Sequence, residues 1–387
     1  MMSPLQLKLM KKLGKTPETT PRLVNTLYDK KDIILDYRYL KFCLEKGMKL
    51  KRISQVVEFE MENYMAETVD FNANERKISP TKLQQNNFKG LSNFLFGVSV
   101  SSTRKYMDAK MVLGKNDFKK QVSKLHFKSY SAFTEHTGLV TFHKRRFYAK
   151  NAVYLGFQIL MLSKLYMLRY YYDTLKITLE KYAIKTDFAY QDTDSILAVH
   201  TWSEGPKSVF VPLRDLAEKF DTSNLDAQTH PWFNMEIEEN ERLRLLNLQK
   251  TNKKRLTCVA FDVPEDIMMF CALKPKVYSI SLLSGREKCR IKGATQKFMD
   301  LKFVHYLNFL LGNEKYEMIY EMKSIRSKNH TVTLEQYKKK VTDKLDVKRF
   351  WLPCGKKSLA YGNKDIPVIK ECWDVLEVML DKVCANE

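Results

Sequence analysis

The sequence predicts an α+β fold, in which helices and small antiparallel sheets occupy separate stretches of the chain. Apolar residues recur with helical periodicity over 150–183, and alternating stretches at 110–114 and 138–144 are typical of strands. Two further apolar runs flank a tight acidic turn at 191–195. Because strands and helices do not alternate regularly, a doubly wound α/β sheet is not favoured. The 387 residues allow roughly two or three packed units.

The first part of the chain predicts mainly helices. Residues 26–66 have a helical pattern, and two short helices fit 74–87 and 88–101, with a break near Pro80. The helix over 150–183 is the longest, and we expect it to bury one face. The apolar positions of that face are Val153, Phe157, Leu160, Met161, Leu165 and Leu168.

Strands dominate the middle of the chain and helices its end. The runs 188–190 and 196–199 predict two strands joined by the acidic turn, followed by a helix at 207–222. Further strands are expected at 256–262 and 276–283. From about residue 295 the pattern is helical and basic, with a hairpin at 346–361 and a helical stretch after Lys364.

The charge points to a polyanionic partner. Lys and Arg number 66 against 45 Asp and Glu, a formal charge of +21. Nucleic acid is the first candidate and an anionic membrane surface the second, while a basic surface without a partner is the third. No window of about 18 residues is free of charge, so we expect no membrane span. The seven scattered cysteines include no C-x-x-C pair, which indicates reduced intracellular thiols.

The acidic turn is the strongest chemical signal. It reads Tyr190-Gln191-Asp192-Thr193-Asp194-Ser195. On an extended strand, residues two apart share a face, so we expect the carboxylates of Asp192 and Asp194 to lie together. Two neighbouring carboxylates need a cation, and hard oxygen ligands favour Mg²⁺. For the D-x-D pair alone, a solvated acidic turn is the more common explanation, so the surrounding sequence decides between the two.

Y-x-D-T-D-S between two apolar strands resembles motif C of family B DNA polymerases. The resemblance implies a palm hairpin in which Asp194 is the indispensable metal ligand and Asp192 its partner. A helix upstream matches the family's K-x-x-x-N-S-x-[YF]-G, reading Lys89-Gly90-Leu91-Ser92-Asn93-Phe94-Leu95-Phe96-Gly97. The resemblance assigns nucleotide binding to Lys89 and Asn93, which share a helical face, and to Phe96 and Gly97. Phe94 departs from the family, which has serine there.

Weaker matches lie on either side. Lys77, beside Arg76, resembles a second phosphate-binding lysine of protein-primed members, although a solvated helix start explains it as well. Downstream, Lys274-Pro275-Lys276-Val277-Tyr278 resembles the K-x-Y element that grips primer–template DNA. Lys292 follows a segment that contains Arg286, Lys288 and Arg290. We expect Lys276 and Tyr278 to share one face of a strand and to contact the DNA backbone.

The order of motifs is closest to polymerases of Polinton (Maverick) elements and related protein-primed viruses. Three stretches carry this narrower resemblance. They are 37–77, with Tyr37-Arg38-Tyr39-Leu40 and Val69-Asp70-Phe71-Asn72; 154–164, with Tyr154-Leu155-Gly156-Phe157; and 326–362, with Arg326-Ser327-Lys328-Asn329-His330 and Leu359-Ala360-Tyr361-Gly362.

The resemblance implies a partial right-hand polymerase with fingers helices, an antiparallel palm sheet and a helical thumb. Residues 1–67 correspond to an insertion-like region after motif A, 68–102 to the fingers, 103–285 to the palm, and 286–387 to the thumb and C-terminal region. Motif A, D-x-x-S-L-Y-P, and the exonuclease D-x-E are not found in the sequence. In family order the chain begins just after motif A, so we expect an incomplete two-Mg²⁺ site and an unpaired palm-sheet edge.

Two hypotheses for function follow. The first is a DNA-directed DNA polymerase that transfers nucleotides from dNTP to a primer 3′-hydroxyl, in replication of a mobile element or virus. The implied partners are primer–template DNA, dNTP and a terminal priming protein, with no membrane, in the nucleus of a eukaryotic host. The second is a catalytically inactive DNA-binding remnant of such an enzyme. RNA-directed synthesis is disfavoured because the Y-x-D-D turn of reverse transcriptases is missing.

Overall fold

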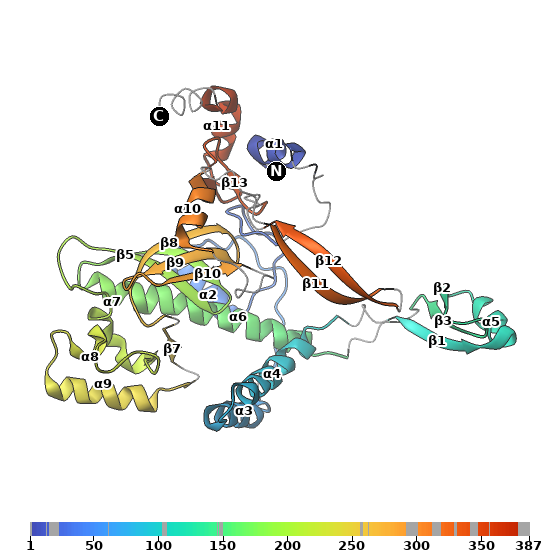
Figure 1. Ribbon diagram of the computed structural model, residues 1–387, viewed down its shortest axis with the longest axis horizontal. Coiled ribbons are helices and arrows are strands. Elements are labelled where there is room, and N and C mark those ends of the chain that lie inside the picture. Colours follow the sequence, from blue (N-terminus) through green and yellow to red (C-terminus); the bar gives the residue numbers. More distant parts are fainter. Residues whose placement is uncertain are drawn as a thin grey trace.

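The computed structural model describes residues 2–12, 14, 23–60, 62–102, 107–144, 146, 150–255, 258–261, 263–291, 301–311, 319–328, 331–340, 347–355 and 357–377. Figure 1 shows helices and small, mostly antiparallel sheets arranged around one long helix. The predicted α+β class is therefore confirmed. None of the described helices is both long enough and apolar enough to span a membrane.

The long central helix is confirmed, but its buried face differs from the prediction. α6 (Val153–Arg169) continues through a π-helical segment, η2 (Tyr170–Leu175), into α7 (Lys176–Glu180). Leu165 is buried, whereas Val153 and Leu160 are about half exposed, at 53% and 48%. The periodicity located a helix correctly, but other elements cover the beginning of α6 only in part. Gly156 provides one close contact there, because a Cβ at this position would overlap Ser99 and Val100.

Beside this helix lies a three-stranded antiparallel sheet in the order β10-β9-β8. Its strands are β8 (Ile267–Lys274), β9 (Val277–Leu282) and β10 (Glu287–Ile291), and β8 was not predicted. α10 (Phe303–Leu311) covers the sheet. The buried side chains of this layer are Cys271, Leu273, Val277, Ile291, Phe303, Tyr306 and Phe309.

A second hairpin and several short helices pack at the C-terminal end of the long helix, around α7. β4 (Lys185–Asp192) and β5 (Ser195–Thr201) precede the 3-10 helix η3 (Pro212–Lys219), β6 (Phe220–Asp221), α8 (Pro231–Asn234), α9 (Glu239–Thr251) and β7 (Val259–Ala260). The helix predicted at 207–222 is thus shorter, and the strand at 256–262 has two residues. Trp232, Phe233 and Leu245 join Leu179 and Ile184 in the largest core cluster.

Two antiparallel helices project from the start of α6 (Figure 1). They are α3 (Ala66–Ile78) and α4 (Lys82–Ser99), so the break near Pro80 is confirmed while the ranges 74–87 and 88–101 were wrong. Thr81 and Gln84 form a capping box that starts α4 directly after the proline. The helix predicted over 26–66 is also wrong, since among the described residues of that range only α2 (Tyr37–Glu45), capped by Asp36, and the start of α3 are helical.

A small unit lies apart from the rest in Figure 1. It contains β1 (Asp108–Leu113), α5 (Gly114–Val122), β2 (Phe127–Ala132) and β3 (Thr137–Phe142), with the sheet order β1-β3-β2. Val112, Val140 and Phe142 form its core. The two strands predicted here are confirmed, and α5 and β2 are additions.

The last part of the chain is less helical than expected. β11 (Ile319–Lys328) and β12 (Thr331–Lys340) form a long hairpin where the pattern predicted helix. β-branched residues such as Ile325, Thr331 and Val332 favour strands there, and the many lysines obscured that signal. The helical thumb expected for 286–387 is therefore wrong for this stretch.

The two ends of the chain meet in one small unit. β13 (Phe350–Trp351) and β14 (Ser358–Leu359) form the hairpin predicted at 346–361, and α11 (Ile366–Glu371) follows. α1 (Pro4–Lys12) packs beside them, where the Gln6 side chain donates to the Arg349 carbonyl at 2.8 Å. Phe350, Tyr361, Ile366 and Trp373 form the core of this unit.

Candidate functional site

The two aspartates lie at the end of the β4–β5 hairpin. Asp192 is opposite Ser195, and Thr193 and Asp194 make the connecting turn. The Asp194 N–H donates to the Asp192 carbonyl at 2.7 Å, and the Ser195 hydroxyl donates to the same carbonyl at 3.2 Å. β4 ends at Asp192, so the expectation that both aspartates share a face of one extended strand is wrong. The tight turn, rather than strand alternation, keeps the two residues together.

Thr193 is the strained residue of this turn. Its φ of 58° lies in the left-handed region, which two-residue hairpin loops commonly require and β-branched residues disfavour. The Thr193 hydroxyl donates to Asp192 Oδ1 at 3.3 Å. The side chain that carries the strain thus also contacts one of the two carboxylates.

A second hairpin turn contacts the first. β8 and β9 are joined by Pro275 and Lys276, and Lys276 has a φ of 63°. Its Nζ lies 2.9 Å from Asp192 Oδ2, and its backbone N–H donates to the Tyr190 hydroxyl at 2.9 Å. The prediction that Lys276 and Tyr278 share a strand face is wrong, because Lys276 belongs to the turn. The structure instead brings the acidic motif and the basic motif together.

Three aromatic rings join the same two hairpins. Tyr190 of β4 lies 5.2 Å from Tyr278 of β9 and 5.9 Å from Phe270 of β8, measured between ring centroids. Phe270 and Tyr278 are 6.0 Å apart, so the three rings form a closed set. Pairs at these separations add to the stability gained from burial alone. Tyr190, the first residue of the acidic motif, therefore fixes the approach of the second hairpin through its ring and its hydroxyl.

The electrostatics of the site centre on Lys276. Its hydrogen bond with Asp192 and the charge of Asp192 raise the pKa of Lys276, and Tyr190 and Asp194 contribute in the same direction. The ammonium thus lies in the field of both carboxylates. Asp192 is partly shielded while Asp194 is exposed.

The donor set can be compared with the needs of Mg²⁺. Asp192 and Asp194 supply hard carboxylate oxygens, which this ion prefers. Asp194 forms no ion pair with a described residue, whereas Asp192 forms one with Lys276. Within the described ranges there is no group of three or more His, Cys, Asp or Glu that could hold a metal. The donor chemistry fits Mg²⁺, and the described part of the chain supplies two carboxylates for it.

Half-buried and buried side chains hold β4 and β5 in place at the end of the hairpin away from the turn. On β5, His200 Nδ1 lies 3.2 Å from the hydroxyl of Thr186 on β4, and the Tyr171 hydroxyl donates to the Thr186 carbonyl at 3.2 Å. Burial lowers the pKa of His200 to about 4. The imidazole is therefore neutral at physiological pH and packs near the open end of the hairpin, opposite the end that carries the carboxylate turn.

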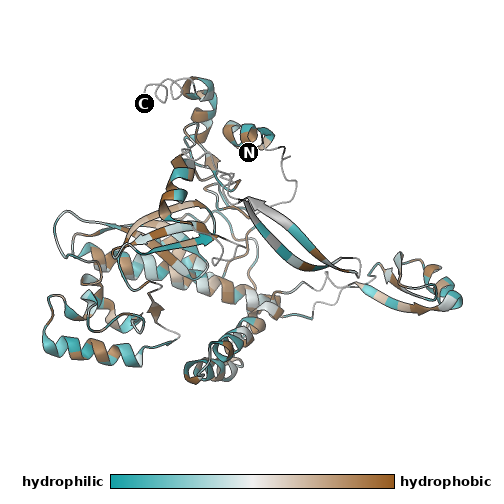
Figure 2. Cartoon of the chain, viewed as in Figure 1, coloured by the Kyte–Doolittle hydropathy of each residue, from teal (hydrophilic) through white to brown (hydrophobic). Residues whose placement is uncertain are grey.

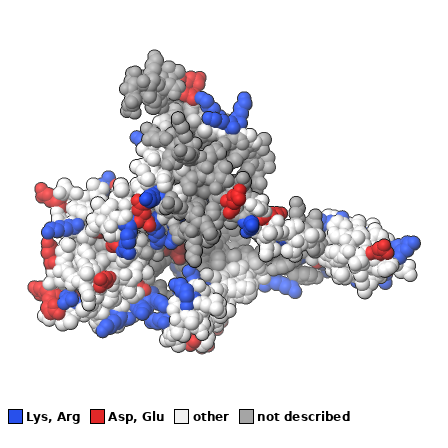
Figure 3. Space-filling view, viewed as in Figure 1, with Lys and Arg blue, Asp and Glu red and all other residues white. Residues whose placement is uncertain are grey.

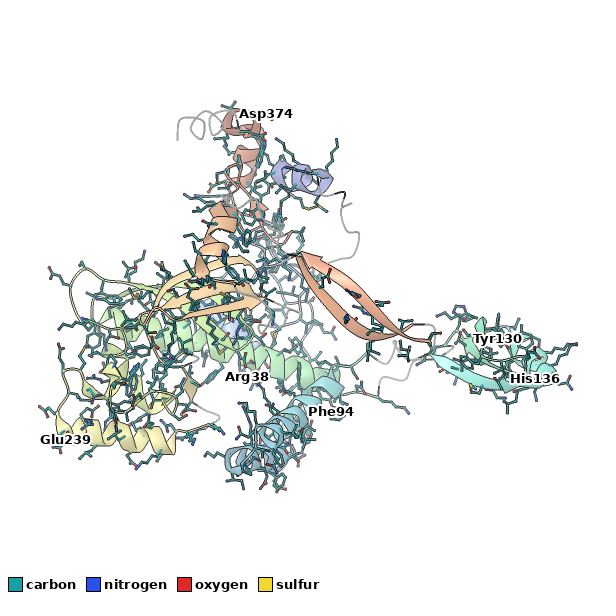
Figure 4. The ribbon with its side chains drawn as sticks, viewed as in Figure 1. Arg38, Phe94, Tyr130, His136, Glu239 and Asp374 are labelled. Atoms are coloured by element: carbon teal, nitrogen blue, oxygen red, sulfur yellow. The ribbon has the colours of Figure 1, made fainter. Side chains whose placement is uncertain are left out.

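The residues predicted to bind nucleotide lie on α3 and α4. Lys89, Asn93 and Gly97 are exposed on α4, Phe96 is half-buried, and Lys77 is exposed near the end of α3. Phe94, at the position that departs from the family, is 66% exposed (Figure 4). Figure 1 shows these helices projecting away from the β8–β9–β10 sheet. The structure thus places this group on one helical arm, apart from the carboxylate hairpin.

The remaining predicted DNA contacts have different outcomes. Lys274 is the last residue of β8, opposite Val277, beside the contact between the hairpins. Lys292 lies outside the described residues. Phe270 was missed, because β8 was not predicted and a single phenylalanine in an apolar run gives no separate signal. No family model, curated protein or solved structure matches this chain.

Proposed function

We propose that this chain carries the fingers helices and the metal-binding hairpin of a family B DNA polymerase of the protein-primed type, which replicates a mobile element or virus. One observation carries the proposal: the acidic Y-x-D-T-D-S turn and the Lys-Pro-Lys-x-Tyr turn meet through the Lys276–Asp192 pair. The sequence singled out both elements separately, and a polymerase needs its metal ligands beside its grip on the primer. A terminal priming protein and the nucleus of a eukaryotic host belong to the same proposal.

In this mechanism the primer 3′-hydroxyl gives its proton to solvent, and its oxygen forms a bond to the α-phosphorus of a dNTP. The bond from the α-phosphorus to the α–β bridging oxygen breaks, and pyrophosphate leaves with that oxygen. Bound Mg²⁺, held by Asp192 and Asp194, would supply the charge that stabilises the attacking and leaving oxygens. Lys89 and Asn93 bind the triphosphate and sugar from one face of α4, with Lys77 nearby on the arm. Because this arm is apart from the hairpin, α3–α4 closes toward the carboxylates when nucleotide binds.

The backbone-gripping role falls on the second hairpin. Lys274 and Tyr278 flank the turn whose Lys276 pairs with Asp192. Contacts from such groups to phosphate and sugar fix the position of a duplex without reading its sequence. The +21 charge of the chain supports the same partner.

A second candidate is a DNA-binding protein without catalysis. Two observations favour it: Lys276 already balances Asp192, and a third acidic ligand is not found among the described residues. In this case the hairpins and the basic surface still bind DNA, but no nucleotide is transferred.

Primer extension and DNA binding by the purified chain distinguish the candidates. Asp194→Asn removes a carboxylate at the turn, and Asp187→Asn is a matched control on β4, where Asp187 pairs with Lys185 at 3.1 Å. The polymerase proposal expects extension by the wild type, a loss of at least about 100-fold in Asp194→Asn, and near-normal activity in Asp187→Asn. Binding without extension by the wild type supports the second candidate. A chain that neither extends nor binds primer–template DNA would overturn both.

A further inference from the structure

Charge is divided along α9 and the turn after it. The helix begins with Glu239 and Glu241, and Lys250 lies in its last turn. The next residues include Lys253, Lys254 and Arg255, so four cations fall within 250–255. Figure 3 shows acidic side chains at the beginning of α9, where Figure 4 labels Glu239, and basic side chains at its end. We name residues 250–255 the basic turn.

The basic turn is rigidly held. Asn252 is 1% exposed, and its side chain donates to the carbonyls of Ala217, Glu218 and Phe220. Lys254 has a φ of 53°, and its backbone N–H donates at 2.7 Å to Asp221, a buried carboxylate. A left-handed lysine is unusual and persists because these contacts determine the backbone. The cations are thus presented on a fixed frame.

The cations of the basic turn differ from the arginines earlier in α9. Arg244 pairs with Glu241 at 2.7 Å, and Arg242 lies 3.6 Å from Glu239. Lys250, Lys253 and Lys254 form no ion pair with a described residue. The negative end of the helix dipole lies at the C-terminus of α9, and a single lysine there is enough to interact favourably with it. Four cations on one short turn repel each other and gain stability from an anionic ligand.

We propose that the basic turn is a second nucleic-acid contact, which binds the phosphate backbone without reading sequence. Lys250 lies in the last turn of α9, and Lys253 and Lys254 follow within four residues, so the three cations can contact neighbouring phosphates of one strand. A membrane surface fits less well, because it favours an apolar face beside the cations. Figure 2 shows α9 as mainly hydrophilic, and Leu243 is the exposed large apolar residue on it.

This contact is separate from the carboxylate site. In Figure 1, α9 lies on one side of the long helix α6 and the β8–β9–β10 sheet lies on the other. A DNA strand bound at the basic turn would therefore lie on the opposite side of α6 from that sheet. The inference rests on the proposed function only in its choice of DNA as the polyanion.

The test uses the full chain and fluorescein-labelled single-stranded and duplex DNA, with binding followed by anisotropy between about 50 and 200 mM salt. The variant combines Lys250→Gln, Lys253→Gln and Lys254→Asn, since asparagine tolerates the left-handed backbone. The matched control combines Lys11→Gln, Lys12→Gln and Lys364→Gln, three exposed lysines elsewhere. Circular dichroism melting of both variants serves as the control that they are folded.

We expect the basic-turn variant to bind DNA roughly tenfold more weakly at physiological salt and to lose roughly 2–3 units of the log–log salt slope, with smaller changes in the control. Equal binding and slope in the two variants would overturn the inference while leaving the proposed function intact. A wild type that binds no DNA would overturn both. Loss of binding to phosphatidylserine vesicles, with DNA binding unchanged, would assign the turn to a membrane surface instead.

Discussion

Lys276 places its ammonium 2.9 Å from Asp192 Oδ2, an oxygen of one of the two carboxylates that would hold the proposed Mg²⁺. The pair joins two hairpins that are distant in sequence. It is only partly shielded, with the Lys276 side chain 49% exposed and that of Asp192 31% exposed. Pairs this exposed contribute little to stability, because water screens them. The consequence of the pair therefore lies in competition for the carboxylate rather than in the fold.

Removal of Lys276 should strengthen metal binding at the acidic turn. In Lys276→Gln, Asp192 loses its fixed cation, so the two carboxylates repel each other and gain more from a divalent ion. We expect Mn²⁺ affinity, measured by isothermal titration calorimetry, to rise by roughly fivefold, which corresponds to about 1 kcal/mol. Lys185→Gln, which breaks the Lys185–Asp187 pair on the same hairpin, should leave it unchanged. Unchanged or weaker Mn²⁺ binding in Lys276→Gln would show that the ammonium does not compete.

The sequence was most informative where local patterns determine structure. The strands around 191–195 and the helix over 150–183 follow from short-range periodicity, and the structure confirms both. The contact between Lys276 and Asp192 could not be predicted, because it depends on how two hairpins pack. β-strand β8 supplies half of that contact, and its continuous apolar run, Ile267 to Leu273, lacks the alternation that identifies half-buried strands.

Elsewhere the charge of the chain concealed its structure. The β11–β12 hairpin contains both β-branched residues, such as Ile325 and Val332, and a basic run at its end (338–340), so a helical basic segment and a strand pair are hard to tell apart there. Residues 48–60 contain apolar side chains at helical spacing, yet Val56 is 78% exposed and Ile53 is 58% exposed. The Phe59 ring stacks on Tyr154 at 5.2 Å between centroids, but the side chains of this stretch stay exposed. An amphipathic pattern that is covered so little forms a helix poorly.

Alanine substitutions at two glycines of α4 test whether nucleotide binds at this helix. A Cβ at Gly90 or at Gly97 would meet nothing within 4 Å. Alanine at either position should therefore stabilise the helix by roughly 0.5–1 kcal/mol. If nucleotide approaches the backbone at Gly97, as the family resemblance implies, Gly97→Ala should also weaken dNTP binding several-fold, whereas Gly90→Ala should not.

Fluorescent dNTP titration in the presence of primer–template DNA measures the affinity, and urea unfolding measures the stability. Gly90→Ala is the internal control, two helical turns away on the same side of α4. Wild-type dNTP affinity in both variants, with the gain in stability present, would place the nucleotide elsewhere on the chain.

The neutral His200, near the open end of the β4–β5 hairpin, should make stability depend on pH. Its pKa falls to about 4 in the folded chain from an ordinary 6.5, because burial disfavours the imidazolium. Between these values the unfolded chain binds a proton that the folded chain does not, so folding stability is full above pH 6.5 and decreases as the pH falls toward 4. The His200 contribution lost at pH 5 is on the order of 2 kcal/mol.

His200→Gln should remove this part of the pH dependence. Glutamine keeps a polar group near the Thr186 hydroxyl, and it does not titrate, so the difference in unfolding free energy between pH 7 and pH 5 should shrink by about 2 kcal/mol in urea titrations. A residual dependence is expected from His230, whose pKa burial also lowers. His136→Gln is the control, since His136 is exposed on the separate β1–β3 unit (Figure 4). An unchanged pH dependence in His200→Gln would mean that the imidazole is hydrated and accepts a proton without loosening the hairpin that carries Asp192 and Asp194.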